Sequence, residues 1–509
     1  MPQFISGLSE LTQQAIQQFR DATLTKMGKP DSLLKVTNQG IETGLGLVWY
    51  DLQTPAKNLF PVVTPLRNRL PRVPGSGGTA TNWRRVTAIN ATSARGFVPQ
   101  GLRNQVVYTT ADTQSAAYKT LGLEDFVSIE AELAAVNLED IRATTAQRLL
   151  WATMIEEEIA DMGANYSVAL SSALTPTLIT EDTGGTIAAG TYNVYCVPLT
   201  MHGYLASAVS ATGVVGLVTV TTATNNSFTY GGGAGIKSNV ATTGALVGAT
   251  NVISAYVPAT TGAVAYAWFV DDGASGAIKL QAITTINSVR LTSLSTSYQT
   301  MTTQWDADHS TNAYAYDGIL YQAFASGSNA YIAKLATGTP GTGTPLTSDG
   351  AGGIVEIDAM LESLWVNYKL GPTVMWVNAQ ESRNLTKKIL GAGGIYHFVT
   401  QNPSGELGNL TGSGRVRTYI NKFGLAGQVE IPIEIHPYLP PGTLVAYTER
   451  LPYPLPNVAN VAEMRLQRDY YQMEWPMRER KYESGVYFNG VLAHYFPPSI
   501  GIITNIGNG

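Results

Sequence analysis

The sequence predicts an α+β body that is interrupted by an all-β domain. Apolar residues recur every three or four positions over residues 138–162, which predicts a long helix. Over residues 183–270 the only charged residue is Lys237, and short runs rich in Val, Tyr and Thr alternate with Gly and Asn turns, as in a β-sandwich. Helical periodicity returns over residues 354–368 and is followed by short strands.

Composition limits the classes of protein that fit. A chain of 509 residues has room for about two to four domains. Only 14% of its residues are charged, below the ~25% of an average soluble domain, and the net charge is -5. Polar surface must come from Thr, Ser, Gly and Asn, or much of the surface must be buried in an assembly. The mild acidity argues against a protein that coats nucleic acid through a broad basic face.

We expect no metal, no cofactor and no contact with a membrane. The one cysteine, Cys196, excludes an intrachain disulfide, and the five histidines lie far apart, so zinc-binding Cys/His spacings are absent. The N-terminal stretch lacks the basic leader and apolar run of a signal peptide, and no stretch is long and apolar enough to span a bilayer. We expect a soluble protein made in a cytoplasm.

Charge is distributed unevenly along the first third of the chain. Residues 52–111 contain no acidic residue and eight basic ones: Lys57, Arg67, Arg69, Arg72, Arg84, Arg85, Arg95 and Arg103. Residues 123–163 contain ten acidic residues, including Glu156, Glu157 and Glu158, and only two basic ones. Opposite potentials steer docking and fix register, so we predict pairing between copies of the chain, with these seven arginines and three glutamates as candidate inter-subunit contacts. The alternative for the glutamate run is a solvated helix face.

Two extended regions precede the long helix. Residues 1–64 begin with a short amphipathic pattern and then become irregular, as in an arm. Residues 65–120 alternate in strand fashion around a Gly-rich tip at 74–78 and return through 105–109, which predicts a two-stranded ribbon. The ribbon has too few apolar residues for a core of its own, so it must lie on something else.

The long helix and the inserted domain follow. Asn137 can cap the helix, Asp140 lies in its first turn, and Gly163 ends the pattern. The all-β domain covers residues 176–310, and its strands resemble those of fibronectin type III or immunoglobulin-like modules. Cys196 lies in one of these strands and is expected to be a small core residue. We expect this domain to face outward, with its ends close together, and the body to fold without it.

The last third of the chain alternates helices and strands. Helices are predicted over 354–371, ending at Gly-Pro, and from a capping-box-like start at 378–381 to Gly391. Strands are predicted at 373–377, at 431–435, at 444–447, and over much of the aromatic tail 470–506. The strands at 431–435 and 444–447 are joined through Pro-Pro-Gly.

The sequence contains no recognisable catalytic motif. None of the glycine clusters is followed by Gly-Lys-Ser/Thr or lies in a strand, Gly-x-Gly-x-x-Gly, helix arrangement. A nucleophile elbow is also absent. His202, His397 and His436 fall near turns or strand ends, where structural or exposed roles are expected. We therefore predict that the protein is not an enzyme.

The order of parts resembles the major capsid proteins of tailed phages, which have the Hong Kong 97 capsid fold. Residues 355–361 are similar to the P-domain helix that leads into the A domain, residues 374–380 to its strand-to-helix step, and residues 432–435 with 440–445 to the paired A-domain strands. The resemblance implies the following division: N-terminal arm 1–64, E-loop 65–120, P domain with the spine helix 121–175, inserted immunoglobulin-like β-sandwich 176–310, P domain 311–370, A domain 371–456, and P-domain return 457–509.

The resemblance also implies a function. A protein of this family self-assembles, as hexamers and pentamers, into the icosahedral shell that encloses the double-stranded DNA genome of a tailed bacteriophage. Its partners would be a portal, scaffolding or decoration proteins, and packaged DNA held on the inner face without sequence specificity. Its location would be the virion, after assembly in the cytoplasm of the bacterial host. Some members join subunits by an isopeptide bond from an E-loop lysine, but residues 58–118 contain no lysine, so this bond is not expected.

Two other classes of protein remain open. A different phage or surface structural protein, such as a tail or S-layer-like component, would also suit the β-sandwich and the low charge. It would not be expected to have a long acidic helix beside a basic ribbon. An α+β enzyme with a carbohydrate-binding β module would need carboxylates clustered in a cleft, whereas the acidic residues here concentrate on one helix.

Overall fold

The computed structural model describes residues 59–75, 77–88, 97–104, 106, 108–136, 139–170, 174–273, 276–391, 415–424, 429–453 and 458–508, together with residue 18. The chain divides into two compact units, Met1–Phe60 with Ala135–Asp140, and Pro61–Ala134 with Ile141–Gly509. The predicted N-terminal arm lies almost wholly outside the described residues, as do Asn137 and Arg95. The second unit contains the fold described below.

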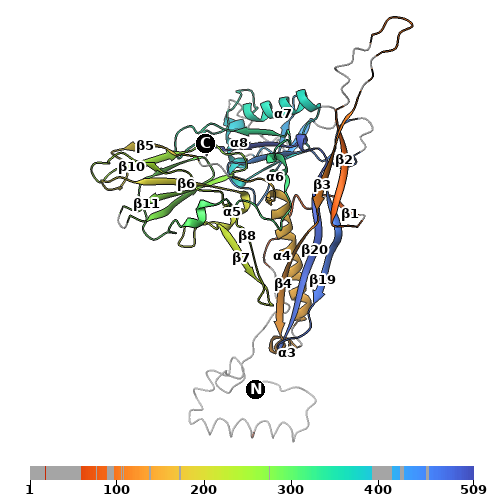
Figure 1. Ribbon diagram of the computed structural model, residues 1–509, viewed down its shortest axis with the longest axis horizontal. Coiled ribbons are helices and arrows are strands. Elements are labelled where there is room, and N and C mark those ends of the chain that lie inside the picture. The colour runs from red at the N-terminus through yellow and green to blue at the C-terminus, as the bar shows by residue number, and fades with distance from the viewer. Residues whose placement is uncertain are drawn as a thin grey trace. The chain divides into compact units, whose positions relative to one another are not determined.

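The elements of the chain are drawn in Figure 1. The helices are α3 (Ile129–Ala135), α4 (Ile141–Gly163), α5 (Met201–Ala206), α6 (Ile319–Phe324), α7 (Val355–Tyr368) and α8 (Ala379–Gly391). The strands are β1 (Arg72–Pro74), β2 (Ala80–Ala88), β3 (Thr110–Ala117), β4 (Lys119–Ser128), β5 (Thr177–Glu181), β6 (Asn193–Leu199), β7 (Leu217–Thr221), β8 (Ser227–Gly231), β9 (Ala241–Thr242), β10 (Val252–Tyr256), β11 (Ala265–Asp271), β12 (Ile278–Thr284), β13 (Ser288–Leu291), β14 (Tyr331–Lys334), β15 (Val374–Val377), β16 (Thr418–Ile420), β17 (Glu430–Ile435), β18 (Leu444–Tyr447), β19 (Ala462–Glu474), β20 (Lys481–His494) and β21 (Gly501–Thr504).

The predicted two-stranded ribbon is confirmed, but its Gly-rich stretch is not its tip. β2 and β3 pair antiparallel, from Ala80 opposite Ala117 to Ala88 opposite Thr110. The Gly-rich stretch lies at the other end, where β1 pairs in parallel with β19 and the Gly75 backbone N–H donates to a carbonyl of that strand. We call residues 66–75, which lie at this end, the root of the ribbon. The sequence indicated a turn at 74–78, but a turn signal does not say which end of a ribbon it occupies.

The long helix is confirmed, with a later start and a different buried face. α4 begins at Ile141, directly after Asp140, a residue type favoured at the N-cap, and the short α3 before it was not predicted. α4 packs against β4 and β20 of a sheet with the order β1-β19-β20-β4 (Figure 1). Its buried residues are largely polar: Leu149, Thr153, Glu157, Glu158, Asp161, Met162 and Gly163. The apolar periodicity therefore located the helix correctly and misjudged which side chains it buries.

The inserted domain is built from two sheets around a shared core. One sheet has the order β13-β10-β5 and the other β12-β11-β6-β9. Their facing side chains, including Ile253, Trp268 and Val289, form one buried cluster. The prediction of a β-sandwich is confirmed, and so is that of Cys196 as a small core residue, since its side chain lies in this cluster. The hairpin β7–β8 belongs to neither sheet and runs alongside α4 (Figure 1).

The inserted domain contributes a side chain to the core of the body. Its ends lie close together, as predicted, because Asn165 donates to the carbonyl of Ser310 at 2.9 Å. However, Met201 of the domain lies in the core cluster of the body, and its backbone N–H donates to the Tyr321 hydroxyl at 3.0 Å. This contact argues against our expectation that the body folds without the domain, because removal would open a shared core.

A six-stranded sheet forms the other half of the body, with the order β14-β21-β18-β15-β17-β16 and with α7 and α8 packed on it. The two predicted helices and the strands predicted at 373–377, 431–435 and 444–447 are confirmed to within three residues at each end, whereas β14 and β16 were not predicted. The resemblance implied that β17 and β18 pair with each other, and this is wrong. β15 lies between them, parallel to β17 and antiparallel to β18. β14 and β21 share this sheet, so the predicted boundaries at 370 and 456 pass through a single sheet.

Candidate functional site

Glu158 ties the start of the ribbon to the long helix. Its two carboxylate oxygens accept the backbone N–H groups of Leu66 (2.9 Å) and Arg67 (2.7 Å). The fully buried His436 contacts the same carboxylate through Nε2 at 2.7 Å. Because the backbone N–H of Tyr438 donates to Nδ1 of His436 at 3.3 Å, we assign the ring hydrogen to Nε2, which donates a hydrogen bond to Glu158. One carboxylate thus joins the ribbon root, α4 and the end of β17.

Glu157 forms the centre of a second, adjacent cluster. The Arg67 guanidinium donates to it at 2.6 Å, and Arg72 pairs with its other oxygen. The Tyr470 hydroxyl also donates to Glu157, and both guanidinium groups lie over the Tyr470 ring, at 5.2 and 4.9 Å from its centre. Arg72 reaches further to Asp469 at 2.7 Å. A fully buried carboxylate is costly unless it is paired, and here two cations and a hydroxyl pair with it.

Arg69 attaches the root to the six-stranded sheet. Its guanidinium pairs with Glu434 on β17 and with Glu449, the latter at 2.7 Å. Glu434 also accepts from the Trp376 indole at 3.4 Å. The three root arginines, Arg67, Arg69 and Arg72, therefore bind four carboxylates of the same chain: Glu157 on α4, Glu434 on β17, Glu449 after β18 and Asp469 on β19.

Asp161 lies one helical turn beyond Glu157 and is also buried. The Tyr316 hydroxyl donates to one of its oxygens at 2.6 Å, and the other oxygen has no hydrogen-bond partner. Burial raises the pKa of the Asp161 carboxyl well above its usual range, and the nearby charge of Glu157 raises it further. The environment therefore favours the protonated form of Asp161.

These contacts correct part of the predicted inter-subunit set. Glu157 and Glu158 are neither a solvated face nor available to another copy, because both are fully buried and bonded within the chain. Arg67, Arg69 and Arg72 are likewise committed to intrachain partners. Glu156 remains exposed.

The structural role expected of His436 is confirmed, since it is buried against Glu158. Sequence reasoning missed the other members of these clusters: Asp161, Tyr316, Glu434, Glu449, Asp469 and Tyr470. They lie up to 403 residues away from the arginines that they contact, so no local spacing could have joined them. The only available signal was an acidic run inside a helix that also carries the apolar periodicity.

The outer part of the ribbon differs from its root. Arg84 and Arg103 are exposed, whereas the side chain of Arg85 and the whole of Arg95 lie outside the described residues. Exposed apolar side chains accompany these charges, from Val86 (61% exposed) to Phe97 (104%). We call residues 97–104 with Val106 and Tyr108 the outer segment of the ribbon. Its large apolar side chains are all exposed: Phe97, Val98, Leu102, Val106 and Tyr108.

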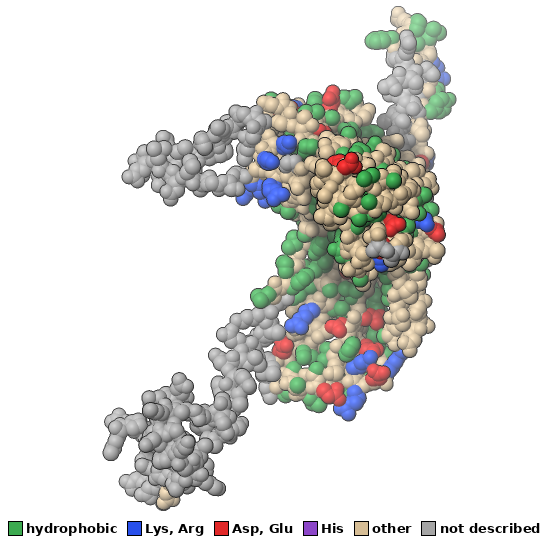
Figure 2. Space-filling view, turned by 90° about the vertical axis from the view of Figure 1, so that its left-hand side faces the viewer, with side chains coloured by type: hydrophobic (Ala, Val, Ile, Leu, Met, Phe, Trp, Pro, Cys, Tyr) green, Lys and Arg blue, Asp and Glu red, His purple; other side chains and the backbone are tan. Residues whose placement is uncertain are grey.

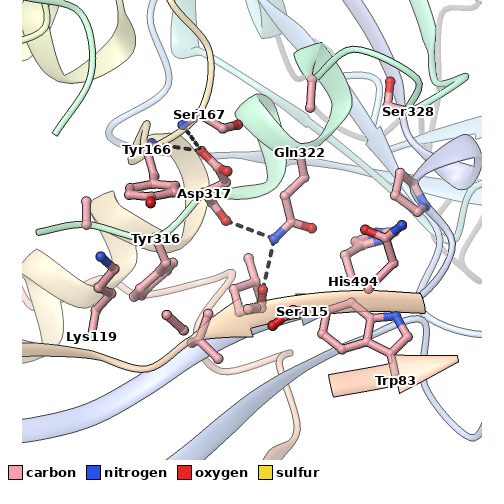
Figure 3. A pocket seen from close by; sticks show the side chains of 18 of the residues that line it. Trp83, Ser115, Lys119, Tyr166, Ser167, Tyr316, Asp317, Gln322, Ser328 and His494 are labelled. Carbon is pink, nitrogen blue, oxygen red and sulfur yellow. Dashed lines mark hydrogen bonds between the residues drawn. The ribbon is translucent and has the colours of Figure 1, made fainter. Parts of the chain in front are cut away.

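A pocket of about 390 Å³ lies at the root of the ribbon, between Trp83 and the loops around residues 166 and 317 (Figure 3). Several of its polar groups have hydrogen-bond or ring partners within the chain. Asp317 accepts the backbone N–H groups of Tyr166 (2.8 Å) and Ser167 (3.0 Å), and Lys119 lies over the Tyr166 ring at 4.6 Å. The pocket thus helps to fix the direction of the ribbon.

The described residues offer neither a metal-binding group nor a membrane-spanning helix. They contain no group of three or more His, Cys, Asp or Glu side chains placed to hold a metal ion. Within the same described ranges, no helix has the length and apolar character needed to cross a membrane.

No protein-family model matches the chain, and no curated protein matches it. Solved structures do match. The capsid of Myoviridae phage XM1 is 10% identical, with 92% of this chain and 100% of that chain covered and a TM-score of 0.37. The capsid of cyanophage P-SCSP1u is 9% identical, with coverage of 93% and 97% and a TM-score of 0.38. The holo-SrpI encapsulin complex from Synechococcus elongatus PCC 7942 is 9% identical, with coverage of 91% and 97% and a TM-score of 0.39.

The first two of these structures are phage capsids, the class of protein that the sequence resembles. All three TM-scores lie below 0.5. We therefore base the functional proposal on the contacts and exposed surfaces of the chain itself.

Proposed function

We propose that the chain is the major capsid protein of a tailed bacteriophage, a non-catalytic subunit that self-assembles through hexamers and pentamers into an icosahedral shell around double-stranded DNA. In this proposal the ribbon β2–β3 acts as the E-loop and α4 as the spine helix. The shell would be assembled in the cytoplasm of the bacterial host.

One observation carries this proposal: the ribbon is held firmly to its own body at the root and exposes apolar side chains at its outer end. The root is held by the buried carboxylates of Glu157 and Glu158. The outer segment exposes Phe97 and Leu102, and an isolated two-stranded ribbon is marginally stable at best. An extension fixed at one end and apolar at the other is suited to lie on another copy of the chain.

A repeating lattice suits such weak contacts. A ribbon that lies on a neighbour, while the body receives the ribbon of another neighbour, forms a head-to-tail interface that closes when the rotation allows it. An exposed ion pair contributes roughly 0.2–1 kcal/mol, and a shell repeats it in every copy. Small contributions per contact therefore suffice for a stable assembly.

The overall charge fits a container for DNA. A chain with a net charge of -5 has little attraction for a polyanion, so DNA can be packed inside without adhering. A portal, together with scaffolding or decoration proteins, would complete the particle. Because residues 58–118 contain no lysine, we expect boiled particles to run on a denaturing gel as one band near 54.3 kDa.

A tail or surface-layer protein is the second candidate, because an anchored apolar ribbon could also join copies into a tube or a sheet. Negative-stain electron microscopy of the purified full-length chain separates the candidates. We expect closed particles of uniform size. Tubes, flat sheets or fibres from the same preparation would contradict the capsid proposal.

A further inference from the structure

A long groove separates the body from the hairpin β7–β8 of the inserted domain. One wall is β4 and the other is the hairpin, which runs beside α4 in Figure 1. The part beside residues 120–126 has a volume of about 640 Å³, and an adjoining part beside α4 has about 350 Å³. Leu123 on β4 and Phe228 on β8 line both parts. Figure 2 shows hydrophobic side chains gathered where this face of the molecule is hollowed.

Both walls of the groove present strand edges. Among the strands that the structure describes, β4 pairs only with β20, and β7 pairs only with β8. The N–H and C=O groups along an open strand edge are a template for another strand. The groove therefore has the geometry for strand addition, in which main-chain hydrogen bonds supply affinity and neighbouring side chains supply specificity.

The body side of the groove is acidic. Glu124 and Asp125 project from β4, and the exposed Glu156 lines the part beside α4. Lys481 lines the same part of the groove as Glu124 and Asp125, but it is already paired with Glu479 at 3.2 Å and Glu483 at 3.0 Å. An occupant with basic side chains would therefore complement this wall.

The hairpin side of the groove is aromatic. Phe228 and Tyr230 stack with ring centres 6.2 Å apart, and Tyr314 meets Phe228 edge-on at 5.4 Å. All three rings line the groove, and Phe228 and Tyr314 are partly exposed. An occupant with apolar side chains on one face would bury this aromatic surface.

The outer segment of the ribbon has this combination of properties. In an extended chain, side chains two apart share a face, so Leu102, Val106 and Tyr108 would project to the same side. Arg103 would project to the opposite side. The side chains of Leu102 and Val106 are 66% and 61% exposed, so a second surface could bury them.

We propose that the groove between β4 and the hairpin β7–β8 receives the outer segment of a second copy's ribbon as an added strand. This inference rests on the proposed function and goes beyond it, because it makes the inserted domain part of the contact between subunits. The hairpin covers the apolar face of the incoming segment, and the acidic wall of Glu124, Asp125 and Glu156 complements its Arg103.

Disulfide trapping between two singly substituted chains tests the inference. One chain carries Val106→Cys and the other Ala223→Cys, at the exposed end of the hairpin; the native Cys196 is buried. A disulfide requires Cα atoms within about 7 Å, so only groups in contact become linked. After co-assembly and oxidation, we expect a band at twice the monomer mass on a non-reducing denaturing gel. The matched control pairs Val106→Cys with Val247→Cys, an exposed position of the inserted domain outside the groove.

The outcomes separate this inference from the proposed function. If closed particles form and the groove pair links no more than the control pair, the inference is wrong and the capsid proposal stands. If the unaltered chain forms no closed particles, the capsid proposal itself fails.

A second comparison applies if the cysteine variants do not assemble. Phe228→Asp places a charge among the aromatic side chains of the groove, and Val247→Asp places one on the far part of the inserted domain. Provided that both variant subunits have the unfolding free energy of the unaltered chain, we expect Phe228→Asp to lower the yield of particles by roughly tenfold or more relative to Val247→Asp. Equal yields would overturn the inference.

Discussion

The arginines of the basic stretch 52–111 have different environments at the root of the ribbon and on its outer part. At the root, Arg67 and Arg72 are 15% and 20% exposed at the side chain, and both pair with Glu157 of their own chain. On the outer part, Arg84 and Arg103 are exposed and have no ion-pair partner among the residues that the structure describes. The same sequence signal thus stabilises the fold where it is desolvated, whereas the solvated arginines are those that we propose to contact another copy of the chain.

The largest expected effect comes from breaking the root. Glu157→Gln would leave Arg67 and Arg72 partly buried without their shared countercharge, so we expect the free energy of unfolding to fall by about 3–5 kcal/mol. Chemical denaturation of the unassembled subunit measures this. The matched control is Glu156→Gln, one residue away and exposed, which should stay within about 0.5 kcal/mol of the unaltered chain. Similar losses for the two variants would contradict the account of the root.

The outer arginines should show the opposite behaviour. In the double variant Arg84→Glu with Arg103→Glu, like charges would face the carboxylates of a neighbouring copy, so we expect far fewer particles. The unfolding free energy of the subunit should change by less than about 1 kcal/mol, because both side chains are exposed. Electron microscopy and denaturation of the same preparation measure the two effects. Normal particles at normal yield would show that these charges take no part in assembly.

The buried Asp161 predicts a pH dependence of folding at the root. Its folded-state pKa is raised, so the folded chain holds this proton more tightly than the unfolded chain, and stability is lost as the pH rises through the folded value. Asp161→Asn keeps an oxygen for the Tyr316 hydroxyl and removes the titration. We expect the unaltered chain to lose more unfolding free energy than this variant between about pH 5 and pH 8. Parallel pH profiles would mean that the pKa of Asp161 is not raised in the folded chain.

Raising the ionic strength should have the smallest effect, but it should distinguish the exposed outer contacts from the buried contacts at the root. At 1 M salt the Debye length is about 3 Å, so exposed charge pairs are screened while buried pairs are affected much less. We expect assembly to weaken with salt and the unfolding midpoint of the subunit to change little. Light scattering follows assembly, and tryptophan fluorescence follows unfolding. An equal response of both would indicate that root and outer contacts have the same exposure.

Local patterns predicted most of the elements because those elements depend on local chemistry. The strand β18 has the predicted bounds, and α7 has the expected apolar face of Ile357, Met360, Leu361 and Leu364. Turn residues and capping side chains sufficed for the boundaries; for example, Asn378 accepts the backbone N–H of Gln380 at the start of α8. Such signals need only a few consecutive residues.

The candidate site could not be predicted in the same way, because its partners are joined only by the tertiary fold. The side chains of Arg69 and Glu434 are 365 residues apart in the sequence, and those of Glu158 and His436 are 278 apart. The glutamate run on α4 suggested a charged surface, yet pairing made it possible to bury Glu157 and Glu158. A charge pattern therefore indicates that partners exist, but not whether they belong to the same chain.

A high-resolution electron-microscopy map of the assembled particle tests the central claim most directly. We expect a closed shell in which the guanidinium groups of Arg67 and Arg72 contact Glu157 of their own chain, while Arg84 and Arg103 lie against carboxylates of a neighbouring copy. A map in which the outer arginines face solvent, or in which the root arginines reach into another copy, would contradict it.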